Sequence, residues 1–339
     1  MSAPPHKRAR MTLARAPLRL HNAVRHYDLH GIKSLVEAGE SLTEIDDYGC
    51  TPLHLAVDGP EAAVEEMMRI LLTADEDERA EALCARADDG LTPLHMVASC
   101  STSKIMDLLL LSVDDEILED VLEMRSHLKG ELFNGNWGKK TADGDLEEID
   151  MEHRTPLHCA LARLNPKDDD VDNDDEEDDE PLSDAARAEA VAMIKLLLDR
   201  GADVNARDAN GRTPVHQAVD AGVQDVVGWL ISAGGDPTMG SKAIGMANTT
   251  LHQAVLKGDE GMVRALIRAA PHLDVDAAGQ NGLTPLCLAA RSNKVACAKA
   301  LVEGGADPRA ATQFHGKSAV DIARTNARTN ILKLFGEDP

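Results

Sequence analysis

The chain has 339 residues, of which 43% are hydrophobic and only 2% aromatic, and its formal net charge at pH 7 is -24. This apolar content can build a large core, and aliphatic side chains with few rings favour stacked helices over a β-sandwich. So strong a negative charge repels the phosphates of nucleic acids and anionic membranes, which argues against direct nucleic-acid or membrane partners and favours proteins with basic surfaces.

The first segment, residues 1–19, differs from the rest because it is basic. It opens with His6-Lys7-Arg8-Ala9-Arg10, and the first acidic residue in the chain is Asp28. It has no apolar core of a secretory signal, and the chain has no run of about eighteen apolar residues that could span a membrane. We predict a disordered tail, with a nuclear-import signal as the open alternative.

The six cysteines show neither the paired spacing of a zinc site nor a disulfide framework. We therefore expect reduced thiols in a cytoplasmic or nuclear protein.

From Leu20 onward one four-residue motif recurs. It reads Thr-Pro-Leu-His or a close variant, and the copies begin at Thr51, Thr92, Thr155, Thr213, Thr249 and Thr284, with weaker copies around Leu20 and Ser318. The third positions of the copies are separated by 33, 41, 63, 58, 36, 35 and 34 residues. The steps predict about eight units of one length, three of which carry insertions.

Each unit is predicted to contain two helices. In the clearest unit Thr213 caps the first helix, Pro214 fits its first turn, and Gly222 ends it. Val226, Val227, Leu230 and Ile231 then give a second helix one apolar face, and Gly234-Gly235 closes that helix. A short helix of this kind must bury its apolar face on neighbouring units.

The three insertions lie at about 73–87, 112–149 and 165–182. The first is interpreted as an extended helix end or a solvated loop. The second is predicted to contain a helix over 113–128, followed by a segment with Phe133 and Trp137, whose rings either anchor the insertion on the stack or form a binding hot spot. The third holds an acidic run, 168–180, which is interpreted as a disordered solvated loop or as a docking segment for a basic partner.

The motif and its period resemble the ankyrin repeat, and Gly201 to Asp208 resembles the loop between repeats in that family. The resemblance covers roughly 20–336 and implies an all-α solenoid with hairpin or loop fingers along one edge, followed here by a short tail, 337–339. It further implies protein binding on the concave face formed by the fingers and the first helices, by a monomer with no cofactor.

Matched copy by copy, the resemblance also implies the contact positions. The candidate protein-binding residues, together with the two rings of the second insertion, are Asp47, Tyr48, Asp58, Asp89, Leu91, Ser99, Phe133, Trp137, Glu152, Arg154, Arg163, Asn210, Arg212, Asp220, Gln280, Leu283, Arg291 and Ser292. The spacing of Leu197, Ala202 and Asp208 around Asn205 resembles a site of asparagine β-hydroxylation, although this asparagine is also the ordinary loop residue.

Catalytic and metal sites are not expected. The five motif histidines recur for architecture, His158-Cys159 lacks further zinc ligands, and the acidic run lacks the glycine and glutamate of a calcium loop. The sequence favours a non-catalytic scaffold or adaptor. The alternative is an inhibitory partner of a basic DNA-binding protein, similar to the Rel inhibitors but without their Asp-Ser-Gly motif.

Overall fold

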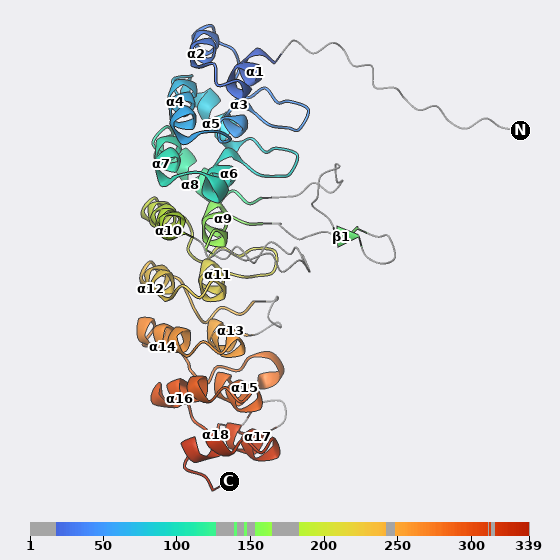
Figure 1. Ribbon diagram of the computed structural model, residues 1–339, viewed down its shortest axis with the longest axis vertical. Coiled ribbons are helices and arrows are strands. Elements are labelled where there is room, and N and C mark those ends of the chain that lie inside the picture. Colours follow the sequence, from blue (N-terminus) through green and yellow to red (C-terminus); the bar gives the residue numbers. More distant parts are fainter. Residues whose placement is uncertain are drawn as a thin grey trace, which may run out of the picture.

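The computed structural model describes residues 18–126, 139–140, 146–147, 153–164, 183–241, 248–310, 312 and 316–338. Helix pairs are stacked in single file, so that the first and last described helices, α1 and α18, lie at opposite ends of the stack (Figure 1). Most helices contact their partner in the same repeat and the equivalent helices of the adjacent repeats. This nearest-neighbour packing is that of a solenoid and confirms the all-α prediction.

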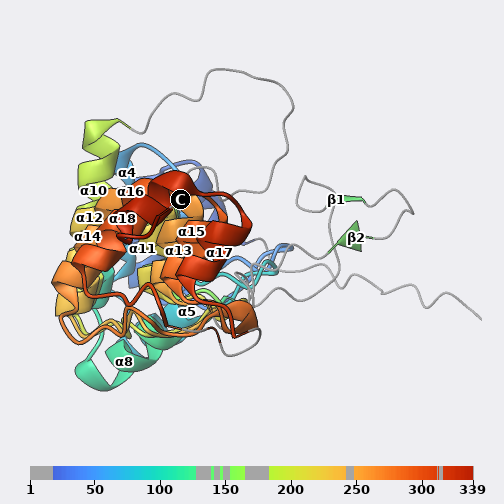
Figure 2. The ribbon, with the colours of Figure 1, turned by 90° about the horizontal axis from the view of Figure 1, so that it is seen from below.

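The helices form two rows, with loops projecting from one side (Figure 2). The inner row consists of α1 (Arg19–Arg25), α3 (Pro52–Leu55), α6 (Pro93–Cys100), α9 (Pro156–Ala162), α11 (Pro214–Asp220), α13 (Thr250–Lys257), α15 (Pro285–Arg291) and α17 (Ala319–Thr325). The outer row consists of α2 (Leu29–Glu37), α4 (Glu61–Leu71), α7 (Ser103–Leu110), α10 (Asp184–Asp199), α12 (Gln224–Ser232), α14 (Glu260–Ala269), α16 (Val295–Glu303) and α18 (Thr329–Leu334).

The repeated motif starts the inner helices as predicted. Thr213 is the N-cap of α11 and Pro214 is its first residue, and Gly222 follows the helix with a φ of 70°. Proline fits this position because the first helical N–H has no partner within the helix. The next helix, α12, ends before Gly234, whose φ of 98° favours glycine.

The core runs continuously through the stack. The third motif residue of every unit is buried, with Val320 the most exposed at 4%. On α12, Val226, Val227 and Leu230 are also fully buried, while Ile231 is half-buried. The predicted apolar face is therefore the one that packs against the adjacent repeats.

The prediction for the first insertion was wrong. Residues 76–84 form a separate helix, α5 (Glu76–Cys84), rather than a helix end or a loop. The Asp75 side chain caps α5, and Ala82 and Leu83 are fully buried. Burial of those two side chains holds a helix whose other positions are mostly charged.

The second insertion begins with the predicted extra helix, α8 (Asp115–Glu123), which is shorter than expected. Further along, β1 (Lys139–Lys140) and β2 (Leu146–Glu147) pair antiparallel. Phe133 and Trp137 lie outside the described residues. The acidic run and most of the basic segment, residues 1–17, also lie outside them, and the run connects α9 to α10.

Candidate functional site

The loops that project from the stack, here called fingers, are each closed at the base by a backbone hydrogen bond. These N–H to O bonds are Asp46–Cys50 (3.0 Å), Ala87–Leu91 (3.0 Å), Ser126–Arg154 (2.8 Å), Asp208–Arg212 (3.0 Å), Ser241–Asn248 (3.3 Å), Gly279–Leu283 (2.7 Å) and Thr312–Lys317 (3.0 Å). At the first tip Gly49 has a φ of 72°, and a Cβ there would lie 2.8 Å from the Asp88 nitrogen. The fingers therefore stack closely on one another.

The motif histidines fix the fingers to the inner helices. In each of five units the Nε2 atom lies near the carbonyl oxygen of the residue that precedes the next threonine of the motif. The pairs are His21–Cys50 (3.0 Å), His54–Leu91 (3.1 Å), His95–Arg154 (2.8 Å), His158–Arg212 (3.3 Å) and His252–Leu283 (2.9 Å). The architectural role expected for the motif histidines is confirmed for His54, His95, His158 and His252, and His21 of the weaker first copy makes the same contact. His216 does not, because its buried Nε2 atom has no hydrogen-bond partner among the described residues.

In the five units in which threonine stands three residues before the histidine, the opposite ring nitrogen contacts that threonine. The backbone N–H of Thr51 donates to Nδ1 of His54 over 3.1 Å, and the Thr51 hydroxyl lies 2.8 Å from the same nitrogen. Since Nδ1 accepts, the neutral ring carries its proton on Nε2 and donates it to the carbonyl. Burial lowers the pKa of His95, His158 and His216 to about 4. These rings are thus neutral structural groups.

The tips of the first two fingers hold one group of exposed predicted contact residues. Tyr48 is 68% exposed. Asp47, its neighbour in sequence, and Asp89, on the next finger, are also exposed. The Asp88 N–H donates to the Tyr48 carbonyl over 2.9 Å, which ties one tip to the next. The result is an acidic surface around an aromatic ring. Exposed Asp88 and Ile45, which no sequence motif singled out, also belong to it.

The ends of the inner helices carry the second group of predicted contacts. Asp58, Ser99, Arg291 and Ser292 are exposed there. Asp220 is half-buried, and its Oδ1 lies 3.2 Å from Nζ of Lys257.

Several predicted residues take part in contacts within the stack. Nη1 of Arg163 donates to the Ser101 carbonyl over 2.8 Å. Arg212 pairs with Asp208 over 2.9 Å, and the Asn210 carbonyl accepts from the Ser241 hydroxyl over 3.2 Å.

The half-buried residues Leu91, Arg154 and Leu283 supply carbonyls to the histidines. Phe133, Trp137, Glu152 and the side chain of Gln280 lie outside the described residues.

Asn205 bridges two successive loops of the stack. Its Nδ2 donates to the Gly234 carbonyl over 3.0 Å, and its Oδ1 accepts from the Asp236 N–H over 2.8 Å. Both ends of the amide are therefore used between repeats, which accounts for an asparagine at this loop position.

Substitution of Asn205 by alanine is expected to lower the free energy of unfolding by about 1–2 kcal/mol, because it leaves these two backbone groups without partners. Urea unfolding followed by circular dichroism measures this change. Hydroxylation of Asn205 stays a prediction. Peptide mass spectrometry after co-expression with an asparagine hydroxylase tests it, and absence of a one-oxygen gain on this residue would exclude it.

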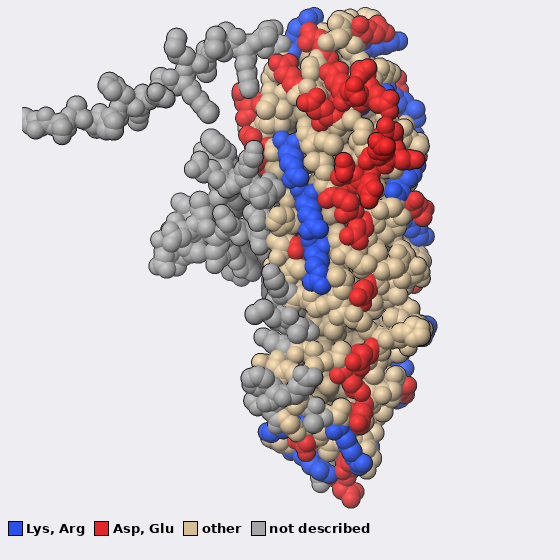
Figure 3. Space-filling model, turned by 180° about the vertical axis from the view of Figure 1, so that it is seen from behind, with Lys and Arg blue, Asp and Glu red and all other residues tan. Residues whose placement is uncertain are grey.

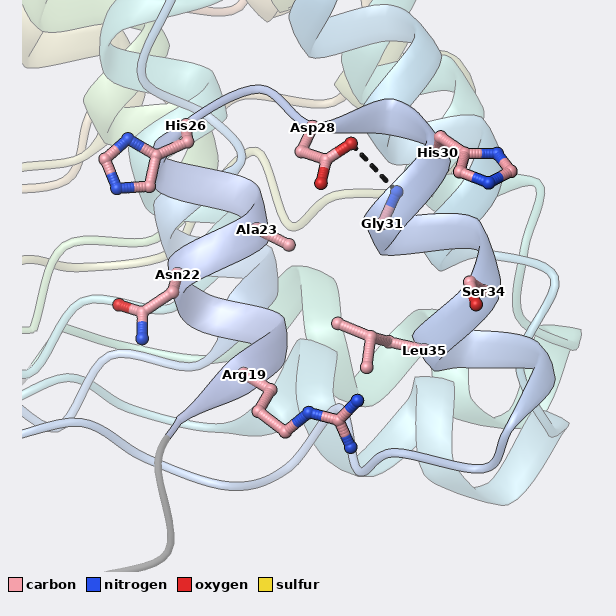
Figure 4. Close-up of a pocket in the computed structure, with 9 residues that line it drawn as sticks. All are labelled: Arg19, Asn22, Ala23, His26, Asp28, His30, Gly31, Ser34 and Leu35. Atoms are coloured by element: carbon pink, nitrogen blue, oxygen red, sulfur yellow. Dashed lines mark hydrogen bonds between the residues drawn. The ribbon is translucent and has the colours of Figure 1, made fainter.

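One hollow lies at the N-terminal end of the stack, between α1 and α2, with a volume of about 500 Å³ (Figure 4). Its lining residues are Arg19, Asn22, Ala23, His26, Asp28, His30, Gly31, Ser34 and Leu35. The Asp28 carboxylate is engaged in capping α2 through the Gly31 N–H at 2.9 Å. The hollow is shallow and open, and no pair of side chains in it forms a nucleophile with an adjacent base.

The described titratable groups show no activated thiol. Burial raises the pKa of all six cysteines, that of Cys50 to about 11, which disfavours the reactive thiolate. Among the described residues no group of three or more His, Cys, Asp or Glu side chains could hold a metal ion. Nor does any helix in the same part of the chain have the length and apolar character needed to cross a membrane.

Stacked helix pairs with bonded fingers define a helical-repeat protein of the kind that presents an extended surface. A model of the ankyrin repeat family, described as three copies of the repeat, matches residues 20–120, 161–241 and 244–338. The chain belongs to the ankyrin repeat family, whose repeats generally mediate interactions between proteins.

Relatives are similar over parts of their length. Protein lin-12 of Caenorhabditis elegans is 34% identical over 159 residues, which are 43% of this chain and 11% of that protein. Human ankyrin repeat domain-containing protein 63 is 35% identical over 131 residues, 38% of this chain and 33% of that protein. Human neurogenic locus notch homolog protein 2 is 30% identical over 199 residues, 57% of this chain and 8% of that protein. The chain thus spans a third or less of these relatives.

Among solved structures, the ankyrin repeat domain of Bcl-3, described as a unique member of the IkappaB protein family, is 18% identical. The likeness covers 93% of this chain and 97% of the other, with a TM-score of 0.46.

Proposed function

We propose that this chain is a non-catalytic adaptor that binds partner proteins along its fingers and the ends of its inner helices. The observation that carries the proposal is the exposed Tyr48 ring at the tip of the first finger, 68% exposed and set among the acidic residues Asp47, Asp88 and Asp89. Exposed tyrosines are frequent anchors of interfaces, because the ring buries a large area at a small cost in side-chain entropy.

The charges around Tyr48 select the kind of partner. Exposed Asp58 extends the acidic surface from the fingers to the end of α3. A partner segment that brings Lys or Arg side chains to these carboxylates would be attracted from solution and held in register. The alternative partner, a basic DNA-binding protein that the chain inhibits, uses the same chemistry.

Replacement of Tyr48 by alanine is expected to weaken capture of partners from cell extract by tenfold or more, in keeping with a hot-spot loss of about 2 kcal/mol. Asp47→Asn and Asp89→Asn are expected to weaken it less and to reduce its sensitivity to salt. Leu111→Ala is the matched control, because Leu111 is 67% exposed but follows α7 in the outer row.

Quantitative mass spectrometry of the captured proteins at two salt concentrations gives the readout. The proposal fails if Tyr48→Ala and Leu111→Ala retain the same partners in the same amounts. Basic DNA-binding proteins that are lost steeply with salt would favour the inhibitory role over a general adaptor.

We further infer a reducing compartment, the cytoplasm or the nucleus. All six cysteines are free, and exposed Cys100 would be open to oxidation elsewhere.

A further inference from the structure

Three arginines form a ladder along one face of the stack. Arg86, Arg125 and Arg207 each stand directly before the first residue of a finger, and all three are exposed. The Arg86 guanidinium donates to the carbonyl of Arg125, Arg125 donates to the carbonyl of Arg207 over 2.8 Å, and Arg207 donates to Gly240 over 3.1 Å. Figure 3 shows these residues as a continuous basic stripe at the base of the fingers.

The ladder keeps most of its hydrogen-bonding capacity. A guanidinium has five N–H groups, and the bond to the next repeat uses one nitrogen of each arginine. No carboxylate of the described residues lies within ion-pair distance of these three side chains. Each is already ordered by its carbonyl bond, so a ligand would not have to order it again.

An acidic ridge lies beside the ladder, formed by the two inserted helices α5 and α8. Its exposed carboxylates are Asp75, Glu76, Asp77, Glu81, Asp114, Asp115, Glu116, Glu119 and Asp120. Arg86 and Arg125 come two residues after the ends of α5 and α8. The guanidiniums nevertheless point along the stack to the next carbonyl, so ladder and ridge stay separate stripes of opposite charge (Figure 3).

We propose that this face is a second protein-binding surface, which takes an extended segment with an acidic residue at every third position and basic residues between them. Packed helices lie about 8–10 Å apart, so successive arginines of the ladder are spaced at roughly that distance. An extended segment in the polyproline II conformation has three residues per turn and rises about 3.1 Å per residue, so every third side chain lies on the same side, about 9 Å from the last, and meets the next arginine of the ladder. Carboxylates can bind guanidiniums in bidentate fashion, and the basic residues between them meet the ridge.

The ridge also argues against a purely anionic ligand. Its nine carboxylates outnumber the three rungs, so a nucleic acid or an all-acidic peptide is repelled by one stripe as it meets the other. This surface lies on the face that carries α5 and α8 and does not include Tyr48 or the other finger-tip contacts proposed above. It therefore stands or falls independently of the adaptor proposal.

The test uses the full chain and a fluorescein-labelled peptide of four Glu-Lys-Ser repeats, with fluorescence anisotropy as the readout. The comparison peptide has the same composition, with its Glu and Lys residues in separate blocks. The repeat peptide is expected to bind at least about tenfold tighter than the block peptide, since only it places carboxylates in register with the ladder.

Arg86→Gln, Arg125→Gln and Arg207→Gln together are expected to weaken binding of the repeat peptide by about tenfold or more. The matched control removes three exposed cations of the outer helices, by Arg187→Gln, Arg268→Gln and Lys333→Gln. At a salt concentration that screens the change in net charge, this control should bind the repeat peptide within about twofold of the parent.

A second variant leaves the ladder bonds intact. Together, Glu76→Gln, Glu119→Gln and Asp120→Asn are expected to weaken binding of the repeat peptide as well. This test remains valid even if the ladder variant fails to fold. The proposal is overturned if the two peptides bind equally, if neither shows saturable binding, or if the ridge variant binds the repeat peptide as the parent does. Tighter binding of single-stranded DNA than of the repeat peptide would overturn it too.

Discussion

Leu230→Ala is expected to lower the free energy of unfolding by about 2–5 kcal/mol. Leu230 is fully buried on α12, which packs against α11 of its own repeat and α14 of the next. Truncation removes apolar contacts and leaves a cavity between repeats that the flanking helices can fill only in part. Because each repeat is stabilised by its neighbours, the loss also weakens coupling between the two halves of the stack.

Urea unfolding followed by circular dichroism measures the effect on Leu230→Ala, and Ile231→Ala provides the control on the same helix. Ile231 is half-buried, so its truncation is expected to cost less than half as much. A broadened or two-step transition for Leu230→Ala alone would show the two halves unfolding separately. Equal midpoints for parent and Leu230→Ala would mean that α12 does not bury this face.

The part of the fold that could be predicted from sequence is the part set by local chemistry. Thr213 and Pro214 start a helix because of one hydroxyl and one missing N–H, and Gly234 ends the next because of its left-handed φ of 98°. Such signals recur in most units, so the number and order of helix pairs follow from them. The position of His54, His95, His158 and His252 between a threonine and a carbonyl follows in the same way.

The first insertion was not predictable by that reasoning. Five of the nine residues of α5 are charged, and its helical form depends on the burial of Ala82 and Leu83 in a helix that contacts α6 and α8. Those contacts are tertiary, and the local sequence of α5 does not predict them. In α8, by contrast, Ile117, Val121 and Leu122 follow the helical period, which is why that helix could be expected.

The sequence could predict which positions lie on the candidate binding surface. It could not predict which side chains at those positions are exposed and which are held by contacts within the stack. Tyr48 and Arg212 occupy corresponding fingers, yet Tyr48 is exposed and Arg212 is held by Asp208. The ladder was missed because Arg86, Arg125 and Arg207 are separated by unequal stretches of inserted sequence. Only the stacked fingers place them at one repeated position.

Acidification from pH 7 to pH 5 is expected to remove several kcal/mol of stability, well above the pH at which ordinary carboxylates are protonated. Three fully buried histidines, His95, His158 and His216, have a pKa lowered to about 4, chiefly by desolvation. In the unfolded chain they titrate near 6.5, so the unfolded state binds more protons between these values.

The direction of the change follows from that difference. The contribution of these histidines is complete above pH 6.5 and is lost as the pH falls from 6.5 toward 4, at up to about 1.4 kcal/mol per pH unit for each group. By pH 5 this amounts to about 2 kcal/mol per histidine as an upper bound. The lowered pKa of His54 and His252 acts in the same direction.

The hydrogen bonds give the structural reason for this sensitivity. In the neutral ring of His158, Nδ1 accepts a hydrogen bond from the Thr155 N–H over 3.3 Å. Protonation places a proton on that nitrogen and puts a charge in the core between two repeats. A protonated His158 cannot keep both its hydrogen bond in the cap of α9 and an uncharged place in the core. The stack therefore opens instead of holding a protonated His158 in its folded form.

Urea titrations at pH 7, 6 and 5 measure the dependence, with His158→Gln and His272→Gln as a matched pair. His158→Gln is less stable at pH 7, but the difference between its stabilities at pH 7 and pH 5 should shrink by about 2 kcal/mol, because one buried proton site is gone. His272 is exposed after α14, so His272→Gln should keep the parental dependence. Equal slopes for the parent and His158→Gln would mean that His158 takes up its proton without opening the stack, and the acid lability would then have to come from the other histidines.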